Sequence, residues 1–201
     1  MTIDNFNIVA PWFDNLSDQG DFFFVQVIQR NKECNVNSSG HVIKDYHFFD
    51  KDTFFATKDE IITLCNAFNA RAYFWINPRN CKQVQYEIIK EALEALELGT
   101  RKLFKCVSRA IGKKRNNKYK SKWILDFDTK DWSLINKYLE IVYKCRPDGV
   151  KVNTFIKTVN GIHVISDPFD LEQFKQNVAI AKLDNIDIHR DNPTVLYYSN
   201  E

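Results

Sequence analysis

Two aspartates, Asp126 and Asp128, stand among apolar side chains in the run SKWILDFDTKDW, residues 121–132. One residue separates them, so on a β-strand both carboxylates point to the same face of the sheet. Like charges this close raise each other's pKa unless a cation lies between them. Oxygen ligands suit Mg²⁺ or Mn²⁺, so the pair predicts a divalent metal site. With a third carboxylate, such a site can hold two metal ions, which stabilise the attacking oxygen and the leaving oxygen of a phosphoryl displacement.

Asp187 is the preferred third carboxylate, in the run KLDNIDIHRDN, residues 182–192. An isoleucine stands on either side of it, so on an alternating strand Asp187 points to the face opposite those two apolar side chains. Asp184 and Asp191 compete with it for this role. The adjacent Arg190 could hold a phosphate, or it could neutralise a neighbouring aspartate.

A polar turn comes before a strand that carries His163 in the run IKTVNGIHVIS, residues 156–166. The residues that form this polar turn are Lys157, Thr158, Asn160 and Gly161. Backbone N–H groups of such a turn, next to Lys and His, suit the phosphates of a nucleotide. An ordinary hairpin with a core histidine is the alternative.

The elements that must position these residues follow the order β-α-β-β-α-β. We expect strands at 122–128, 149–158, 162–166 and 185–190, and helices at 131–144 and 171–182, with a further strand possible in principle at 192–198. This order is that of a ferredoxin-like or RNA-recognition-motif-like unit. In its sheet, the first strand lies between the third and the fourth. Asp126, His163 and Asp187 are therefore expected to converge.

The N-terminal part predicts an α/β half, with strands at 22–29 and 71–77 and a helix at 83–98. Thr57 and Glu60 have the spacing of a capping box, which predicts a helix start. Residues 31–56 are expected to be irregular. The fold class is thus α+β. Its expected parts are an N-terminal half at 1–100, a basic connector at 101–121 and the RNA-recognition-motif-like half at 122–201, in one compact unit.

Basic residues are concentrated in one segment, although the formal net charge of the chain is only +2. Residues 101–122 hold many Lys and Arg and no acid. We expect this segment to bind a nucleic-acid backbone, and solvated surface is the alternative. The residues expected to bind nucleic acid are Lys113, Lys114 and Arg115, together with Arg71 and Arg79 on or after the second N-terminal strand.

The five cysteines include no CxxC pair, which argues against a zinc knuckle and for reduced thiols in a cytoplasmic compartment. The N-terminus shows no signal peptide pattern. No apolar run approaches the ~20 residues of a membrane span, so no membrane association is expected.

Three motifs in order resemble those of the archaeo-eukaryotic primase superfamily, whose plasmid and phage members are called primase-polymerases. The first is an apolar strand that ends in DxD, here WILDFD with Asp126 and Asp128. The second is a glycine-containing turn followed by His, here NGIHVI with Gly161 and His163. The third is an apolar residue followed by Asp, for which Asp187 fits best.

The resemblance implies a replication enzyme that adds nucleotides to a primer on a single-stranded DNA template. Asp126, Asp128 and Asp187 would bind Mg²⁺ or Mn²⁺, and His163 would contact the phosphates of an incoming NTP or dNTP. A hydroxyl would attack the α-phosphate and pyrophosphate would leave. A replicative helicase or a zinc-bearing accessory protein would be a partner. A catalytically inactive relative that binds nucleic acid is the main alternative.

Three other classes of protein fit the residues less well. A haloacid-dehalogenase-like phosphatase needs Thr or Val where Lys130 stands, and too few residues follow. A rolling-circle replication initiator needs two metal-binding histidines where IHVIS has one. An RNA-recognition-motif binding module needs aromatic residues where the carboxylates stand, because acids repel a phosphate backbone.

Overall fold

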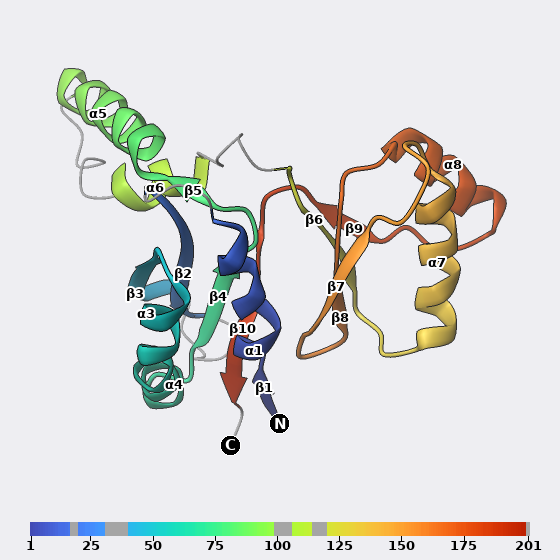
Figure 1. The fold of residues 1–201 in the computed structure, drawn as a ribbon, viewed down its shortest axis with the longest axis horizontal. Helices are drawn as coiled ribbons and strands as arrows, with labels where there is room; N and C mark the ends of the chain where they lie inside the picture. The colour runs from blue at the N-terminus through green and yellow to red at the C-terminus, as the bar shows by residue number, and fades with distance from the viewer. Residues whose placement is uncertain (17–19, 31–39, 99–105, 114–119, 200–201) are drawn as a thin grey trace. The chain divides into compact units, whose positions relative to one another are not determined.

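The computed structural model describes residues 1–16, 20–30, 40–98, 106–113 and 120–199. The fold is α+β, with two antiparallel sheets and helices (Figure 1). The chain divides into two compact units, one made of Met1–Tyr119 with Val195–Glu201 and the other of Lys120–Thr194. The final strand therefore belongs mainly to the first unit, although we expected residues 122–201 to stay together.

The first unit is built on a six-stranded sheet. Its strands are β1 (Thr2–Asp4), β2 (Asp21–Gln29), β3 (His41–Phe48), β4 (Arg71–Trp75), β5 (Arg79–Asn80) and β10 (Pro193–Ser199). They follow the order β1-β10-β4-β2-β3, with β5 paired to β2. The helices are α1 (Phe6–Val9), the 3₁₀ helix η1 (Ala10–Asn15), α3 (Lys51–Ala56), α4 (Lys58–Ala67), α5 (Cys81–Glu97) and α6 (Cys106–Lys113).

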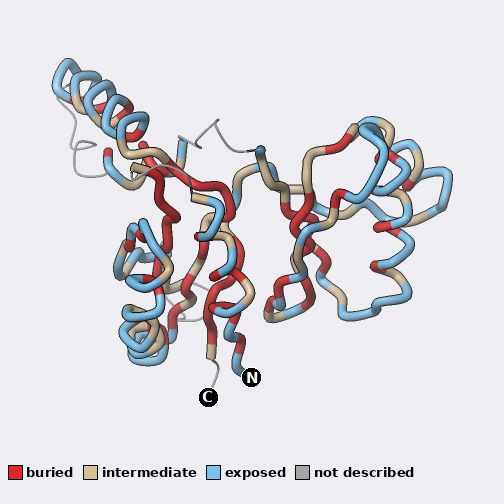
Figure 2. Tube along the Cα trace, in the orientation of Figure 1, coloured by how far each residue is buried: buried red, intermediate tan, exposed pale blue. Residues whose placement is uncertain are grey.

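Aromatic side chains fill both sides of β2, which explains its unbroken apolar run. On one face, the Phe23 ring lies 5.0 Å from the ring of Phe74 and 4.9 Å from that of Phe13. On the other face, Phe22 and Phe24 pack with residues of α5 and α6. Figure 2 shows β2 as buried along most of its length.

Two expectations for the first unit are wrong. Residues 31–56 are not all irregular, because β3 and α3 lie within them. The capping box at Thr57 and Glu60 is not formed either, since Thr57 makes no side-chain cap. Helix α3 ends immediately before Thr57, and both the hydroxyl and the N–H of Thr57 donate to the Thr53 carbonyl, at 2.8 and 3.1 Å, in place of the capping contacts. Glu60 instead accepts hydrogen bonds from Lys44 and Tyr46 of β3.

The second unit contains a four-stranded sheet and two helices. Its elements in chain order are β6 (Trp123–Phe127), α7 (Trp132–Lys144), β7 (Val152–Lys157), β8 (Ile162–Ser166), α8 (Leu171–Ile180) and β9 (Asp187–His189). The sheet order is β7-β8-β6-β9. Strand β6 thus lies between β8 and β9, which confirms the neighbours predicted for it.

Helices α7 and α8 cover one face of this sheet (Figure 1). Leu125 and Phe127 of β6 point to that face and pack in a core with residues of both helices. Because side chains alternate along a strand, Asp126 points to the opposite face. Asp131 caps α7 by accepting hydrogen bonds from the N–H groups of Ser133 and Leu134, which fixes where the helix begins after β6.

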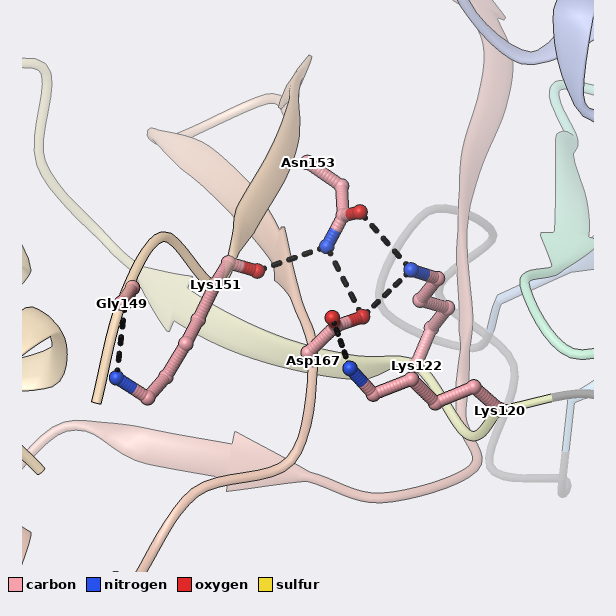
Figure 3. Close-up of polar contacts among 6 residues, drawn as sticks. All are labelled: Lys120, Lys122, Gly149, Lys151, Asn153 and Asp167. Carbon is pink, nitrogen blue, oxygen red and sulfur yellow. Dashed lines mark hydrogen bonds and ion pairs between the residues drawn. The ribbon is translucent and has the colours of Figure 1, made fainter. Parts of the chain in front are cut away.

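The entry to β6 is held against the end of β8 by Asp167 (Figure 3). Its carboxylate accepts hydrogen bonds from Lys120 at 2.5 Å and from Lys122 at 2.6 Å. Asn153 of β7 bridges the group, since it accepts from Lys122 and its own amide lies 3.4 Å from Asp167. Burial acts to raise the pKa of Asp167, but both lysines together outweigh it and lower that pKa. This cluster fixes the central strand at the end opposite Asp126.

Candidate active site

Asp126 lies in a row of side chains that crosses all four strands of the second sheet. Its direct cross-strand partners are His163 of β8 and Asp187 of β9. His163 is in turn paired with Ile156 of β7. Directly opposite residues in antiparallel strands share a face, so these side chains lie together on the face without helices. The register thus brings together Asp126, His163 and Asp187.

His163 makes the closest polar contact to Asp126. Its Nε2 atom lies 3.3 Å from the Asp126 Oδ1 atom, and its Nδ1 atom lies 2.8 Å from the Thr194 hydroxyl. When Nε2 carries the proton toward Asp126 in the neutral ring, Nδ1 accepts from Thr194. The imidazole is therefore held at both nitrogens, and its orientation on the sheet is fixed.

A second imidazole reaches Asp126 from β9. The His189 Nε2 atom lies 3.8 Å from the Asp126 Oδ2 atom. The hydrogen bond from His163 is the largest cause that holds the pKa of Asp126 below its ordinary value, while burial opposes it. The charges of His163 and then of His189 lower the pKa further. Asp126 is therefore a stable carboxylate that faces two potential cations.

His189 and Thr194 were not among the predicted site residues. The signal for His189 is its spacing, since it stands two residues after Asp187 and alternation puts both on one face. The signal for Thr194 is absent from the local sequence, because its contact to His163 spans 31 residues. Thr194 is fully buried, so its hydroxyl orients His163 and is not available to attack a substrate.

The other two predicted carboxylates are exposed. Asp187 faces Asp126 across the strands, and Asp128 follows the last residue of β6. Among the residues that the structure describes, no group of three or more His, Cys, Asp or Glu is arranged to hold a metal ion. Asp126, Asp128 and Asp187 still supply the carboxylate oxygens that Mg²⁺ or Mn²⁺ prefers, so the donor chemistry fits such an ion.

The turn before β8 has a structural role at two of its four predicted positions. A Cβ atom on Gly161 would lie 1.8 Å from the Phe127 carbonyl oxygen, so only glycine fits beside the segment that leads to Asp128. The Thr158 hydroxyl accepts a hydrogen bond from the Gly161 N–H at 3.0 Å and is buried. Thr158 and Gly161 therefore fix the turn, whereas Lys157 and Asn160 are exposed on it.

Arg190 lies apart from the predicted site. Its guanidinium is 5.4 Å from the centre of the Trp123 ring, and Trp123 packs against the core beneath α7 and α8. Trp123 shares the helix-covered face of β6 with Leu125 and Phe127, so this contact directs Arg190 away from the face that carries Asp126. The prediction that Arg190 binds the phosphates beside Asp126 is therefore not supported by its position.

The prediction that Arg79 contacts nucleic acid is wrong, because its side chain is fully buried. Its Nε atom donates to the Ile111 carbonyl at 2.7 Å and its Nη1 atom to the Asn77 carbonyl at 2.9 Å. The guanidinium also lies over the Trp75 ring. Arg79 thus serves the carboxyl end of α6, where a cation is favourable.

The other predicted nucleic-acid residues differ in their surroundings. Lys113 is half exposed and pairs with Glu91 at 2.6 Å. The Arg71 guanidinium lies 4.4 Å from the centre of the Tyr198 ring, within the first unit. Lys114 and Arg115 lie outside the described residues. That the basic segment binds nucleic acid therefore stays a prediction.

Comparison with protein-family models, with curated proteins and with solved structures found no match.

The four cysteines within the described ranges, Cys65, Cys81, Cys106 and Cys145, are thiols, and burial raises the pKa of Cys65 to about 12. In the described part of the chain, no helix has both the length and the apolar character that crossing a bilayer requires.

Proposed function

We propose that this chain is a primase-polymerase-like nucleotidyltransferase that adds nucleotides on a single-stranded DNA template. The observation that carries the proposal is the row on the second sheet, in which Asp126 has His163 and Asp187 as direct partners. Three segments that are far apart in the sequence and that resemble three primase motifs thus meet at one place.

The arrangement of the second unit supports the same proposal. Its elements follow the order β6-α7-β7-β8-α8-β9, with β6 and β8 in the middle of the sheet. We assign this unit to the RNA-recognition-motif-like class, which has this order and leaves one sheet face without helices. The exposed carboxylates on that face are accessible to a nucleotide and a template.

In the proposed reaction, Asp126, Asp128 and Asp187 would hold Mg²⁺ or Mn²⁺, which neutralises charge on the phosphates. His163, held by Thr194 at Nδ1, would donate its Nε2–H to a phosphate oxygen of the incoming NTP or dNTP in place of Asp126, whose carboxylate would then hold the metal ion. Exposed Lys157 and Asn160 on the adjacent turn are further candidates for phosphate contacts. A primer 3′-hydroxyl attacks the α-phosphate and pyrophosphate leaves, so catalysis consists of positioning and charge stabilisation.

The direct test is nucleotide incorporation on a defined single-stranded template. The purified chain is incubated with primed and unprimed DNA, NTPs or dNTPs, and Mg²⁺ or Mn²⁺. We expect products that depend on the template and the metal ion. The assay is repeated with a replicative helicase or a zinc-bearing accessory protein, because a primase-like chain of this kind would work with such a partner.

A second candidate, an inactive primase-like protein that binds nucleic acid, is favoured by the contacts of Asp126. Its two carboxylate oxygens face His163 and His189, and no cluster for a metal ion is formed among the described residues. Binding of single-stranded DNA without nucleotide incorporation under any of these conditions would favour this candidate over the enzyme.

A further inference from the structure

Helix α5 presents large apolar side chains to solvent. Tyr86, Ile89, Leu93 and Leu96 are 65%, 58%, 56% and 68% exposed. Figures 1 and 2 show α5 projecting from the sheet of the first unit, with much of its surface exposed. A continuous apolar row of this kind is uncommon on a monomer and marks an interaction surface. We call these four residues the outer row.

The opposite side of α5 is the one that attaches it to the protein. Its buried residues are Val84, Glu87, Glu91 and Ala95. Within this set, Glu91 accepts a hydrogen bond from Arg109 of α6 at 2.9 Å and another from Lys113 at 2.6 Å. At 3.6 residues per turn, these positions and the outer row lie on opposite sides of the helix. The helix thus turns the carboxylates of Glu87 and Glu91 inward and its largest apolar side chains outward.

The spacing of the outer row identifies what kind of surface would cover it. The intervals of three, four and three residues from Tyr86 to Leu96 are those of the a and d positions of a coiled coil. The row is also symmetric about residue 91. When a second α5 lies antiparallel across a two-fold axis, Tyr86 faces Leu96 of the second copy and Ile89 faces its Leu93.

The charges at the ends of α5 favour the antiparallel orientation. Lys82 stands near the N-terminus of the helix, and Glu94 and Glu97 stand near its C-terminus. Antiparallel pairing brings Lys82 within reach of Glu97 of the second copy, and it also opposes the two helix dipoles. Parallel pairing would place the glutamates of both copies together and the two lysines together.

A hollow beside the outer row provides a place for a side chain from the second copy. It has a volume of about 530 Å³ and is lined in part by Lys82, Gln85, Tyr86 and Ile89. Because Tyr86 faces Leu96 of the second copy in the antiparallel arrangement, that leucine is the side chain nearest to the hollow.

We propose that this chain forms a homodimer through antiparallel pairing of α5. The outer row and the side chains next to it would bury on the order of 1,000 Å² in total, the lower end of the range for specific interfaces. The dimer is therefore weak, with a dissociation constant in the micromolar range. The proposal does not depend on the nucleotidyltransferase activity.

Sedimentation equilibrium of the full chain from about 1 to 200 µM tests this proposal across the micromolar range. We expect a reversible monomer–dimer equilibrium, and a Leu93→Glu variant that is monomeric throughout. Ile180→Glu serves as a matched control, because Ile180 is an exposed apolar residue on α8 and its replacement leaves the dimer unchanged. A wild-type chain that stays monomeric, or a Leu93→Glu dimer of unchanged affinity, would overturn the proposal.

A charge exchange tests the antiparallel orientation. Lys82→Glu is expected to weaken the dimer several-fold at low salt, and the double variant Lys82→Glu with Glu97→Lys to restore it. Both residues are exposed, so circular dichroism should show the same fold for each variant. A tighter dimer in the single variant, or no recovery in the double variant, contradicts the antiparallel pairing.

Discussion

At the scale of single residues, the candidate site is centred on a carboxylate that two imidazoles approach from neighbouring strands. His163 lies 3.3 Å from Asp126, and Thr194 orients it from the other side. Such a set keeps Asp126 ionised and limits the rotation of His163. Both properties suit a site that positions charged phosphates, because little reorganisation remains when the substrate binds.

The pKa of Asp126 provides a test of this arrangement. The hydrogen bond from His163 lowers the pKa of Asp126 in the folded state. Ionised Asp126 therefore stabilises the fold at every pH above its unfolded-state pKa of about 3.9. This contribution is lost as the pH falls through the folded-state pKa. We expect the Asp126 carboxyl carbon to titrate below its ordinary range by NMR, and to titrate higher in His163→Ala. An unchanged titration in His163→Ala would contradict the contact.

Gly161 gives a second prediction at this scale. Gly161→Ala is expected to lower the free energy of unfolding by about 2–4 kcal/mol, because the added Cβ atom meets the Phe127 backbone. Gly112→Ala in α6 is the control. A Cβ atom there lies 3.9 Å from the nearest atom of Trp75, so alanine should stabilise the helix by about 0.5–1 kcal/mol. Urea unfolding of both variants measures the difference, and equal effects would refute the close approach.

That Asp126, His163 and Asp187 share one face of three neighbouring strands could be predicted, because it depends on strand order and on alternation. Their direct pairing depends on the register, which only the structure shows. Thr194 could not, since its contact to His163 depends on where the chain goes after β9. The burial of Arg79 could not be predicted either. An arginine after a strand is typical of a surface, and only the position of the α6 carbonyl groups makes its interior place favourable.

At the scale of elements, α5 shows how a helix can bury charge and expose apolar residues. Periodicity predicted a helix at 83–98, and the structure has α5 at Cys81–Glu97. Periodicity alone assigns the apolar side to the core. The reverse is observed because α6 supplies Arg109 and Lys113, which pair with Glu91 on the inner side.

This attachment predicts different effects for two glutamates of the same helix. Glu91→Gln should lower the free energy of unfolding by about 1–3 kcal/mol, because a buried partner of two cations is lost. Glu94→Gln should change it by less than about 0.5 kcal/mol, because its pair with Lys90 is exposed. Denaturant unfolding measures both values. Equal losses would show that the inner side does not hold α5 in place.

At the scale of the whole molecule, the chain enters the second unit after Tyr119 and leaves it at Thr194. A further strand at 192–198 was left open by the sequence pattern, and β10 occupies Pro193–Ser199. Their place in the first sheet, between β1 and β4, could not be predicted because it depends on pairing with residues at the other end of the chain. In the sequence, the second unit is therefore an insertion between two parts of the first.

The central claim is that Asp126, with Asp187 beside it, forms a nucleotidyltransferase site. The most direct measurement is the rate of template-dependent nucleotide incorporation by wild type, Asp126→Asn, Asp187→Asn and Asp148→Asn, each with Mg²⁺ and with Mn²⁺. Asp148 is an exposed aspartate outside the row and serves as the control. We predict a loss of at least about 100-fold for Asp126→Asn and Asp187→Asn, and wild-type rates for Asp148→Asn. Incorporation that persists in Asp126→Asn, or that is absent from the wild type under all conditions, would contradict the claim.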